Sequence, residues 1–248
     1  MGNKLFRSSN IEHLEDIYRI YQQNKIGKNG DCLKKYKAIL FDLDGTLADT
    51  APGIRGCYRH ALNALGKPPP TDDQFANVIG APPLEIFKKR FNLNEQMAKH
   101  ALDIYRARYA KIGIKETKIY NGIPQLLNQL KKNGYFLGVA TLKSNLFAKS
   151  MLINMGIADY FDVVKGMDSK DQLTKAAILE YCISILNILP KDSLLIGDSY
   201  YDSEGAKLSG MDFAAVIWGY GFTSEADTVK YNPIFIAKAP EEIHNFLC

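Results

Sequence analysis

The chain has 248 residues, of which 46% are hydrophobic and 23% are charged, and its formal net charge is +4. This length can bury a substantial core and fits one large α/β domain or a core with a modest inserted domain. The basic residues are spread along the chain, which argues against nucleic-acid binding. Its 4 cysteines show no close pairing, which argues against a disulfide framework or a zinc site.

The first 35 residues are predicted to form a helical extension and a linker. Ser9 and Glu12 fit a capping box, and apolar residues from Ile11 onward recur at helical spacing until about Lys25. The stretch has no apolar core of a signal peptide, and no long apolar segment follows it. We therefore expect a soluble, cytoplasmic protein that does not bind membranes.

The segment from Ala38 to Leu47 is predicted to be a buried strand that ends in two carboxylates. Alternate side chains of an extended backbone share a face, so Asp42 and Asp44 point together where Gly45 lets the chain turn. Such like charges make chemical sense with a cation and an electrophile between them, which suggests metal-assisted phosphoryl transfer. Taken alone, the segment also fits a strand that runs into an ordinary Asp-Gly turn.

Residues 52 to about 115 have a helical pattern throughout, without a convincing strand. After Gly122, apolar strands alternate with helices. The strands are predicted near residues 136–140, 161–164, 194–196 and 213–217, and the helices near residues 123–132, 144–155, 173–186 and 203–208. This alternation predicts a parallel sheet covered on both faces, in which ligands bind at the carboxyl ends of the strands. Asp42, Thr141 and Asp198 each lie at such an end, so we expect them to converge on one pocket.

Four motifs in the expected order resemble those of the haloacid dehalogenase superfamily. The first is Phe41-Asp-Leu-Asp-Gly-Thr-Leu, and the second is Val139-Ala-Thr. The third is Lys175 at the start of a helix, and the fourth is Leu194-Leu-Ile-Gly-Asp-Ser-Tyr-Tyr-Asp. The Ile79-Gly-Ala-Pro-Pro-Leu turn and the Trp218-Gly-Tyr-Gly turn resemble the phosphoglycolate phosphatase-like subgroup.

This resemblance implies an α/β fold with a Rossmann-like parallel sheet core flanked by helices. The core is expected to comprise residues 36–51 and 118–248. Residues 52–117 are expected to form an inserted all-helical cap domain of the superfamily's first cap class, which closes over the site and excludes water. Residues 1–35 form the extension. We expect the Trp218-Gly-Tyr-Gly turn to shape a loop at the edge of the sheet.

The resemblance also implies roles for the paired carboxylates. Asp42 is the expected nucleophile, which attacks phosphorus and forms an aspartyl-phosphate. Asp44 protonates the leaving alkoxide and then draws a proton from the attacking water. Haloacid dehalogenases lack an Asp at this second position, so its presence favours phosphate chemistry.

The cofactor implied by the resemblance is Mg²⁺. Its expected ligands are the Asp42 carboxylate, the backbone carbonyl of Asp44, and Asp198. Asp202 is either a further ligand or a residue that supports the ligands and caps a helix. Ser199 is expected to assist through its hydroxyl or its backbone.

The expected phosphate contacts are the Thr141 hydroxyl, the backbone N–H of Leu142 and the Lys175 ammonium group. Lys170, in the loop before this predicted helix, is an alternative to Lys175, because the family's usual Lys-Pro pair is absent and Thr174-Lys175 stands in its place. Lys143 is predicted to be solvated, since the family often has Ser-Lys-Pro where this chain has Leu142-Lys-Ser.

Taken together, the sequence predicts Mg²⁺-dependent hydrolysis of a small phosphorylated metabolite by a monomer or homodimer, with phosphoglycolate as the leading substrate. A 5′-nucleotide or a sugar phosphate is the next candidate. A phosphomutase of the β-phosphoglucomutase kind is a second class, although those relatives usually have Val where this chain has Thr46. A non-catalytic interaction protein that kept the fold is a third class.

Overall fold

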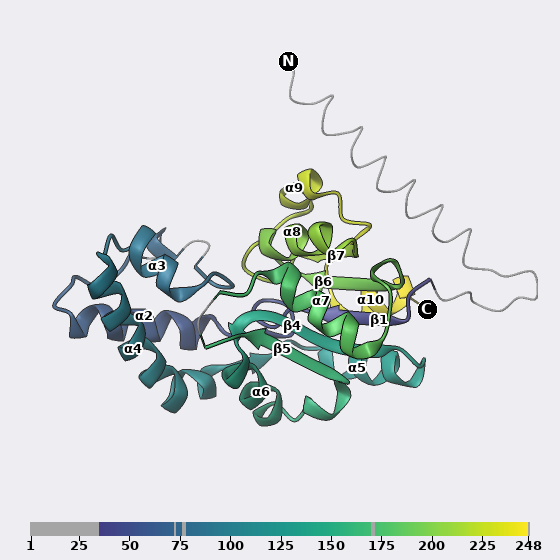
Figure 1. Ribbon diagram of the computed structural model, residues 1–248, viewed down its shortest axis with the longest axis horizontal. Helices are drawn as coiled ribbons and strands as arrows, with labels where there is room; N and C mark the ends of the chain where they lie inside the picture. Colours follow the sequence, from purple (N-terminus) through teal and green to yellow (C-terminus); the bar gives the residue numbers. More distant parts are fainter. Residues whose placement is uncertain (1–34, 72, 76–77, 170–171, 248) are drawn as a thin grey trace, which may run out of the picture.

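The computed structural model describes residues 35–71, 73–75, 78–169 and 172–247 (Figure 1). The predicted N-terminal helix near residues 9–25 and the alternative lysine, Lys170, lie outside these ranges. In the described part of the chain, no helix is long and apolar enough to cross a membrane.

A parallel sheet forms the centre of the molecule, and its strand order among the described residues is β5-β4-β1-β6-β7-β8. In that order the strands are Val163–Met167, Phe136–Ser144, Ala38–Phe41, Ser193–Gly197, Asp212–Val216 and Phe235–Ala237. The first strand in sequence, β1, therefore lies between β4 and β6. This order brings the ends of β1, β4 and β6 together at one edge of the sheet, as predicted.

Helices cover both faces of the sheet because the strands are apolar on both sides. Ile39 and Phe41 of β1 pack into one core with α5, α6 and α10, whereas Leu40 packs into a second core with α7 and α8. These helices are Ile123–Lys132, Asn145–Asn154, Pro240–Leu247, Lys175–Leu186 and Tyr200–Ser209, in the order just named. The α/β fold with a covered parallel sheet is confirmed.

A helical block, residues 51–116, follows the first strand and lies at one end of the molecule (Figure 1). It contains α2 (Ala51–Ala64), α3 (Pro83–Lys89) and α4 (Glu95–Lys111). Its interior is aromatic: the Tyr58 ring lies 5.0 Å from that of Phe87 and 4.9 Å from that of Tyr105. Two short antiparallel strands, β2 (Ala48–Asp49) and β3 (Lys118–Ile119), pair where the chain enters and leaves the block.

Some elements differ from the prediction at their ends. β4 extends to Ser144 with an irregular register against β5 after Ala140, so Thr141 lies within this strand instead of ending it. The sheet also has one more strand beyond β7: the chain passes through α9 (Glu225–Thr228), forms β8 and ends in α10. The Trp218-Gly-Tyr-Gly turn therefore connects two strands of the sheet.

Candidate active site

Asp42 and Asp198 lie side by side because they follow the paired parallel strands β1 and β6. The turn after Asp44 needs a glycine: Gly45 has a φ of +84°, and a Cβ there would lie 2.2 Å from Asp198 Oδ2. The glycine thus allows both the turn and the close approach of the second carboxylate.

Three buried carboxylates, those of Asp42, Asp198 and Asp202, form a cluster in which one oxygen from each lies within 4.8 Å of the others. Asp202 belongs to the first turn of α8. Its Oδ2 accepts hydrogen bonds from the backbone N–H of Ser199 at 3.0 Å and from the Ser199 hydroxyl at 2.6 Å. The bond from the Ser199 N–H, together with the bond from the Asp202 backbone N–H to the Ser199 side chain, forms a capping box at the start of α8, so local helix capping fixes this carboxylate.

Lys175 is the positive charge within this cluster. Its Nζ lies 2.7 Å from Asp42 Oδ1 and 2.6 Å from Asp202 Oδ1. The lysine is the first residue of α7, and the Thr174 side chain caps that helix by accepting from the Ala177 N–H at 3.2 Å. Gly205 of α8 makes room for the lysine, since a Cβ there would lie 2.5 Å from Lys175 Cγ.

Among the described residues the charges of this cluster do not balance, because three carboxylates lie together and one ammonium group, that of Lys175, contacts two of them. Burial raises the pKa of Asp42 to about 7, although Lys175 opposes this shift. Burial and the charges of Asp202 and Asp42 raise the pKa of Asp198 to about 8. Burial alone would lower the pKa of Lys175, but the charges of Asp202 and Asp42 hold it above its usual range. Such a donor set fits a hard divalent cation, which would stabilise the ionised carboxylates.

Asp198 is held in place by the loop that follows β7. Its Oδ2 accepts hydrogen bonds from the backbone N–H groups of Tyr220 at 2.7 Å and Gly221 at 3.2 Å. These two donors engage Oδ2 and fix the orientation of the carboxylate.

Asp44 forms a second buried ion pair, with Lys143. Lys143 Nζ lies 2.9 Å from Asp44 Oδ1 and 3.2 Å from Oδ2, and it lies over the Tyr109 ring, 4.6 Å from the centroid. The prediction that Lys143 is solvated is therefore wrong, because its side chain is only 7% exposed. Lys143 lies at the irregular end of β4, and a pattern of residues in the sequence does not reveal that it meets Asp44.

Thr141 and Leu142 lie near the same edge, on the irregular end of β4. Thr141 is buried, and its hydroxyl accepts a hydrogen bond from the Lys143 N–H at 3.1 Å. Leu142 lines a pocket beside Asp44. The structure therefore places the described catalytic and phosphate-binding candidates at one edge of the sheet. Lys170 lies outside the described residues, so the choice between Lys175 and Lys170 stays a prediction.

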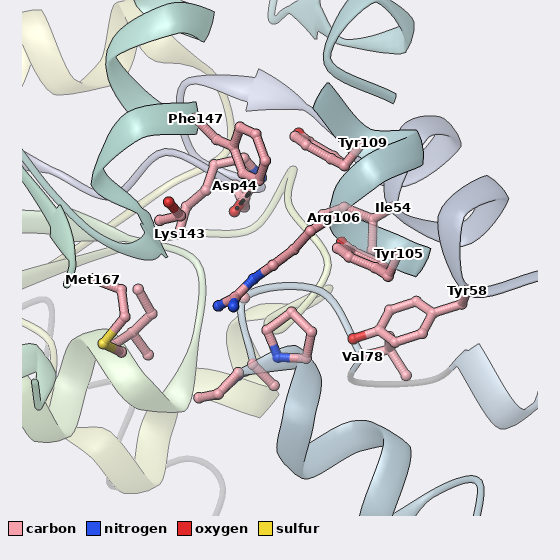
Figure 2. A pocket seen from close by; sticks show the side chains of 16 residues that line it. Asp44, Ile54, Tyr58, Val78, Tyr105, Arg106, Tyr109, Lys143, Phe147 and Met167 are labelled. Carbon is pink, nitrogen blue, oxygen red and sulfur yellow. Dashed lines mark hydrogen bonds and ion pairs between the residues drawn. The ribbon is translucent and has the colours of Figure 1, made fainter. Parts of the chain in front are cut away.

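The pocket beside Asp44 lies between the sheet and the helical block (Figure 2). Asp44, Lys143, Phe147 and Met167 line its sheet side. On the block side, Tyr58, Tyr105 and Tyr109 present aromatic rings and Arg106 extends from α4 into the pocket. Sequence reasoning missed this arginine and these rings, because helical spacing identifies a buried face of α4 but not the cavity that it meets.

The family model of the haloacid dehalogenase-like hydrolases matches residues 39–216, so this chain belongs to that family. A haloacid dehalogenase-like family hydrolase from Streptococcus pneumoniae has the same fold, with a TM-score of 0.80 and 30% identity. The match covers 86% of this chain and 99% of that protein. The family predicted from the four motifs is confirmed.

Three curated relatives carry different names. Tyrosine-protein kinase PtkA from Mycobacterium tuberculosis is 34% identical over 84% of this chain and 72% of its own length. A 5′-nucleotidase from Pseudomonas aeruginosa is 32% identical over 82% of this chain and 91% of its own length. A phosphoglycolate phosphatase from Nitrosococcus oceani is 30% identical over 87% of this chain and 98% of its own length. The phosphatase relatives support the predicted enzyme class, a phosphoric monoester hydrolase.

Proposed function

We propose that this protein hydrolyses a small phosphate monoester with Mg²⁺ through an aspartyl-phosphate on Asp42. The observation that carries the proposal is the buried cluster of Asp42, Asp198 and Asp202 around Lys175, within a family of hydrolases. A phosphate ester is a dianion, so its attack by a carboxylate requires concentrated positive charge around the phosphoryl oxygens.

The metal ligands in this proposal are the carboxylates of Asp42 and Asp198 and the backbone carbonyl of Asp44. The three clustered carboxylates and the raised pKa values of Asp42 and Asp198 support a cation here. Asp202 instead supports the site, because one of its oxygens meets Lys175 and the other meets Ser199. When bound, Mg²⁺ would neutralise negative charge on the phosphoryl group and on the carboxylates.

Asp42 attacks phosphorus, and the bond to the leaving oxygen breaks. Lys175, already in contact with Asp42, favours the ionised form of the nucleophile and neutralises a phosphoryl oxygen. The Thr141 hydroxyl and the Leu142 N–H bind further phosphoryl oxygens. Water then attacks the aspartyl-phosphate, which releases phosphate and restores Asp42.

Asp44 carries the proton in both steps. It gives a proton to the leaving alkoxide and later takes one from the attacking water. Lys143 pairs with both oxygens of the ionised Asp44 carboxylate, the form that takes a proton from the attacking water, and we assign it the role of orienting this group.

The pocket beside Asp44 receives the leaving group in this proposal. Arg106 extends into it, which favours a leaving group with an anionic end, and phosphoglycolate remains the leading candidate. The aromatic lining of the pocket by Tyr105 and Tyr109 favours a 5′-nucleotide as the second candidate, because the edges of these rings offer apolar surface to a base. Relatives with both names occur among the similar proteins.

We further propose that residues 52–117 act as a cap over the core formed by residues 36–51 and 118–248. The position of the pocket between the helical block and the sheet supports this division. The working state is a cytoplasmic monomer or homodimer that acts on a small phosphorylated metabolite. Two alternatives, a phosphomutase and a non-catalytic interaction protein, are distinguished by the test below.

The test is phosphate release from a panel of phosphoglycolate, 5′-nucleotides and sugar phosphates, with and without Mg²⁺. Asp42→Asn is measured in parallel, and circular dichroism checks that it folds. We expect release from one compound or a few, lost without Mg²⁺ and in the variant. Transfer to a sugar in place of release would indicate the mutase, and no turnover of any compound would indicate the non-catalytic protein.

A further inference from the structure

Tyr220 lies between the carboxylate cluster and the helical block. Its backbone N–H donates to Asp198 Oδ2 at 2.7 Å. Its hydroxyl donates to Asp49 Oδ1 and accepts from the backbone N–H of Ala51 at 3.0 Å. One residue therefore contacts both a proposed metal ligand and the segment through which the chain enters the block.

The segment through which the chain leaves the block is joined to the same contact. Asp49, which accepts from the Tyr220 hydroxyl, pairs with Lys118 of β3, and the backbone N–H of Tyr120 donates to the Leu47 carbonyl at 3.1 Å. Because β2 and β3 pair with each other, the Tyr220 hydroxyl is connected to both of the crossings between the sheet and the block.

The loop that carries Tyr220 is tightly fixed against the site. Trp218 Nε1 donates to the Thr46 carbonyl at 3.1 Å, and Phe222 N donates to the Asp198 carbonyl at 2.7 Å. A Cβ at Gly219 would lie 2.2 Å from Asp198 Oδ2, so the backbone passes directly over this carboxylate. Such a short, closely packed connection transmits a displacement of Asp198 to the tyrosine ring instead of absorbing it.

We propose that Tyr220 is a positioning residue that couples the Asp198 carboxylate to the two crossings, so that cation binding and the position of the helical block influence each other. The proposal rests on the cation site of the proposed function. Coupling is reciprocal: if the cation favours one arrangement of the crossings, that arrangement favours the cation by the same factor. The Trp218-Gly-Tyr-Gly turn thereby acquires a role beyond shaping a loop.

The test uses the full chain with MgCl₂ and no substrate, and compares wild type with Tyr220→Phe. Calorimetry measures Mg²⁺ affinity, and hydrogen exchange measures the amide of Ala51, which donates to the tyrosine hydroxyl. In wild type we expect Mg²⁺ to slow exchange at Ala51 and near residues 118–120. In Tyr220→Phe we expect this effect to disappear and Mg²⁺ affinity to fall about 2- to 10-fold, the scale of one net hydrogen bond.

Two further variants make the result specific. Asp49→Asn weakens the contact with the Tyr220 hydroxyl and leaves Tyr220, which meets Asp198, unchanged. We expect the same loss of coupling, and this variant replaces Tyr220→Phe if that protein does not fold. Tyr181→Phe removes a hydroxyl from an exposed tyrosine of α7, 44% accessible, and should match wild type.

The outcomes separate this inference from the proposed function. If wild type binds Mg²⁺ and both Tyr220→Phe and Asp49→Asn keep its affinity and its exchange response, the coupling is overturned and the cation site stands. If wild type binds no Mg²⁺, both the coupling and the cation site are overturned.

Discussion

Two buried lysine–aspartate contacts lie at the edge of the sheet, and they differ in their balance of charge. Lys175 meets Asp42 and Asp202 within a cluster that also contains Asp198, so three carboxylates face one ammonium group. Lys143 meets only Asp44 among the described residues' ion pairs, and its charge lies over an aromatic ring. The first arrangement fits a further cation, whereas the second holds one carboxyl group in a fixed orientation.

The largest expected difference between the two contacts follows from removing Asp44, the residue proposed to carry the proton. Asp44→Asn should lower kcat for an alkyl phosphate about 10²- to 10⁴-fold, because the leaving alkoxide then receives no proton. With p-nitrophenyl phosphate, whose leaving group needs no proton, the loss in the first step should be much smaller. Steady-state and single-turnover rates on both compounds measure this difference, and an equal loss in the first step would contradict the role of Asp44.

Removing each lysine compares the contacts directly. Lys175→Met and Lys143→Met should each lower the free energy of unfolding of the metal-free protein by about 3–5 kcal/mol, because each leaves a buried carboxylate without its partner. Mg²⁺ should restore part of this loss in Lys175→Met, where the cation faces the cluster, and little in Lys143→Met. Chemical denaturation with and without Mg²⁺ measures this.

Lys165→Met is the matched control for these variants, since Lys165 lies over the exposed Tyr181 ring, 4.4 Å from its centroid, and away from the cluster. Its unfolding free energy should change by about 1 kcal/mol or less. Equal recovery by Mg²⁺ in Lys143→Met and Lys175→Met would show that the two contacts do not differ as described.

A smaller effect is expected in the pocket beside the Lys143–Asp44 contact. Arg106→Met should raise KM for phosphoglycolate about 10- to 100-fold, the scale of a hydrogen bond to a charged group. It should leave KM for p-nitrophenyl phosphate nearly unchanged, because that compound has no anionic end to meet the arginine. Kinetics on both compounds decide this, and a parallel rise in both KM values would remove Arg106 from substrate recognition.

The smallest expected effect is a pH dependence of stability, which comes from the cluster of Asp42, Asp198 and Asp202. The folded pKa values of Asp42 and Asp198, about 7 and about 8, lie above the ordinary value of 3.8. Their contribution to metal-free stability is complete below about pH 4 and is lost as the pH rises through 7 and 8. Because Mg²⁺ competes with these protons, the rise in Tm on adding Mg²⁺ should grow from about pH 5 to about pH 8. A Tm shift that does not change over this range would contradict a cation held by these carboxylates.

The sequence predicts the cluster of three carboxylates and Lys175 well, because local sequence features determine the position of each member. Asp42 and Asp198 directly follow apolar strands, Lys175 begins a helix after a capping threonine, and Asp202 lies in the first turn of α8. Each position can be read from a strand end or a helix start, and a parallel sheet then brings those ends together.

The Lys143–Asp44 contact and the pocket beside it could not be predicted in the same way. Lys143 reaches Asp44 across 99 positions of sequence, through the irregular end of β4, and nothing in its neighbours indicates that it is buried. Arg106 lies on a helix whose spacing predicts a buried face but not a cavity. The short strand β8, with three residues, is likewise fixed by pairing with β7 and not by a pattern of its own.

The central claim is that Asp42 becomes phosphorylated during turnover. The most direct measurement is to mix the protein with its substrate and Mg²⁺, quench in acid within one turnover, digest, and locate the phosphoryl group by mass spectrometry. We predict that it lies on Asp42, forms at least as fast as phosphate is released, and is absent from Asp42→Asn. Phosphate release at the full rate with no phosphorylated peptide, or with the group on another residue, would contradict the claim.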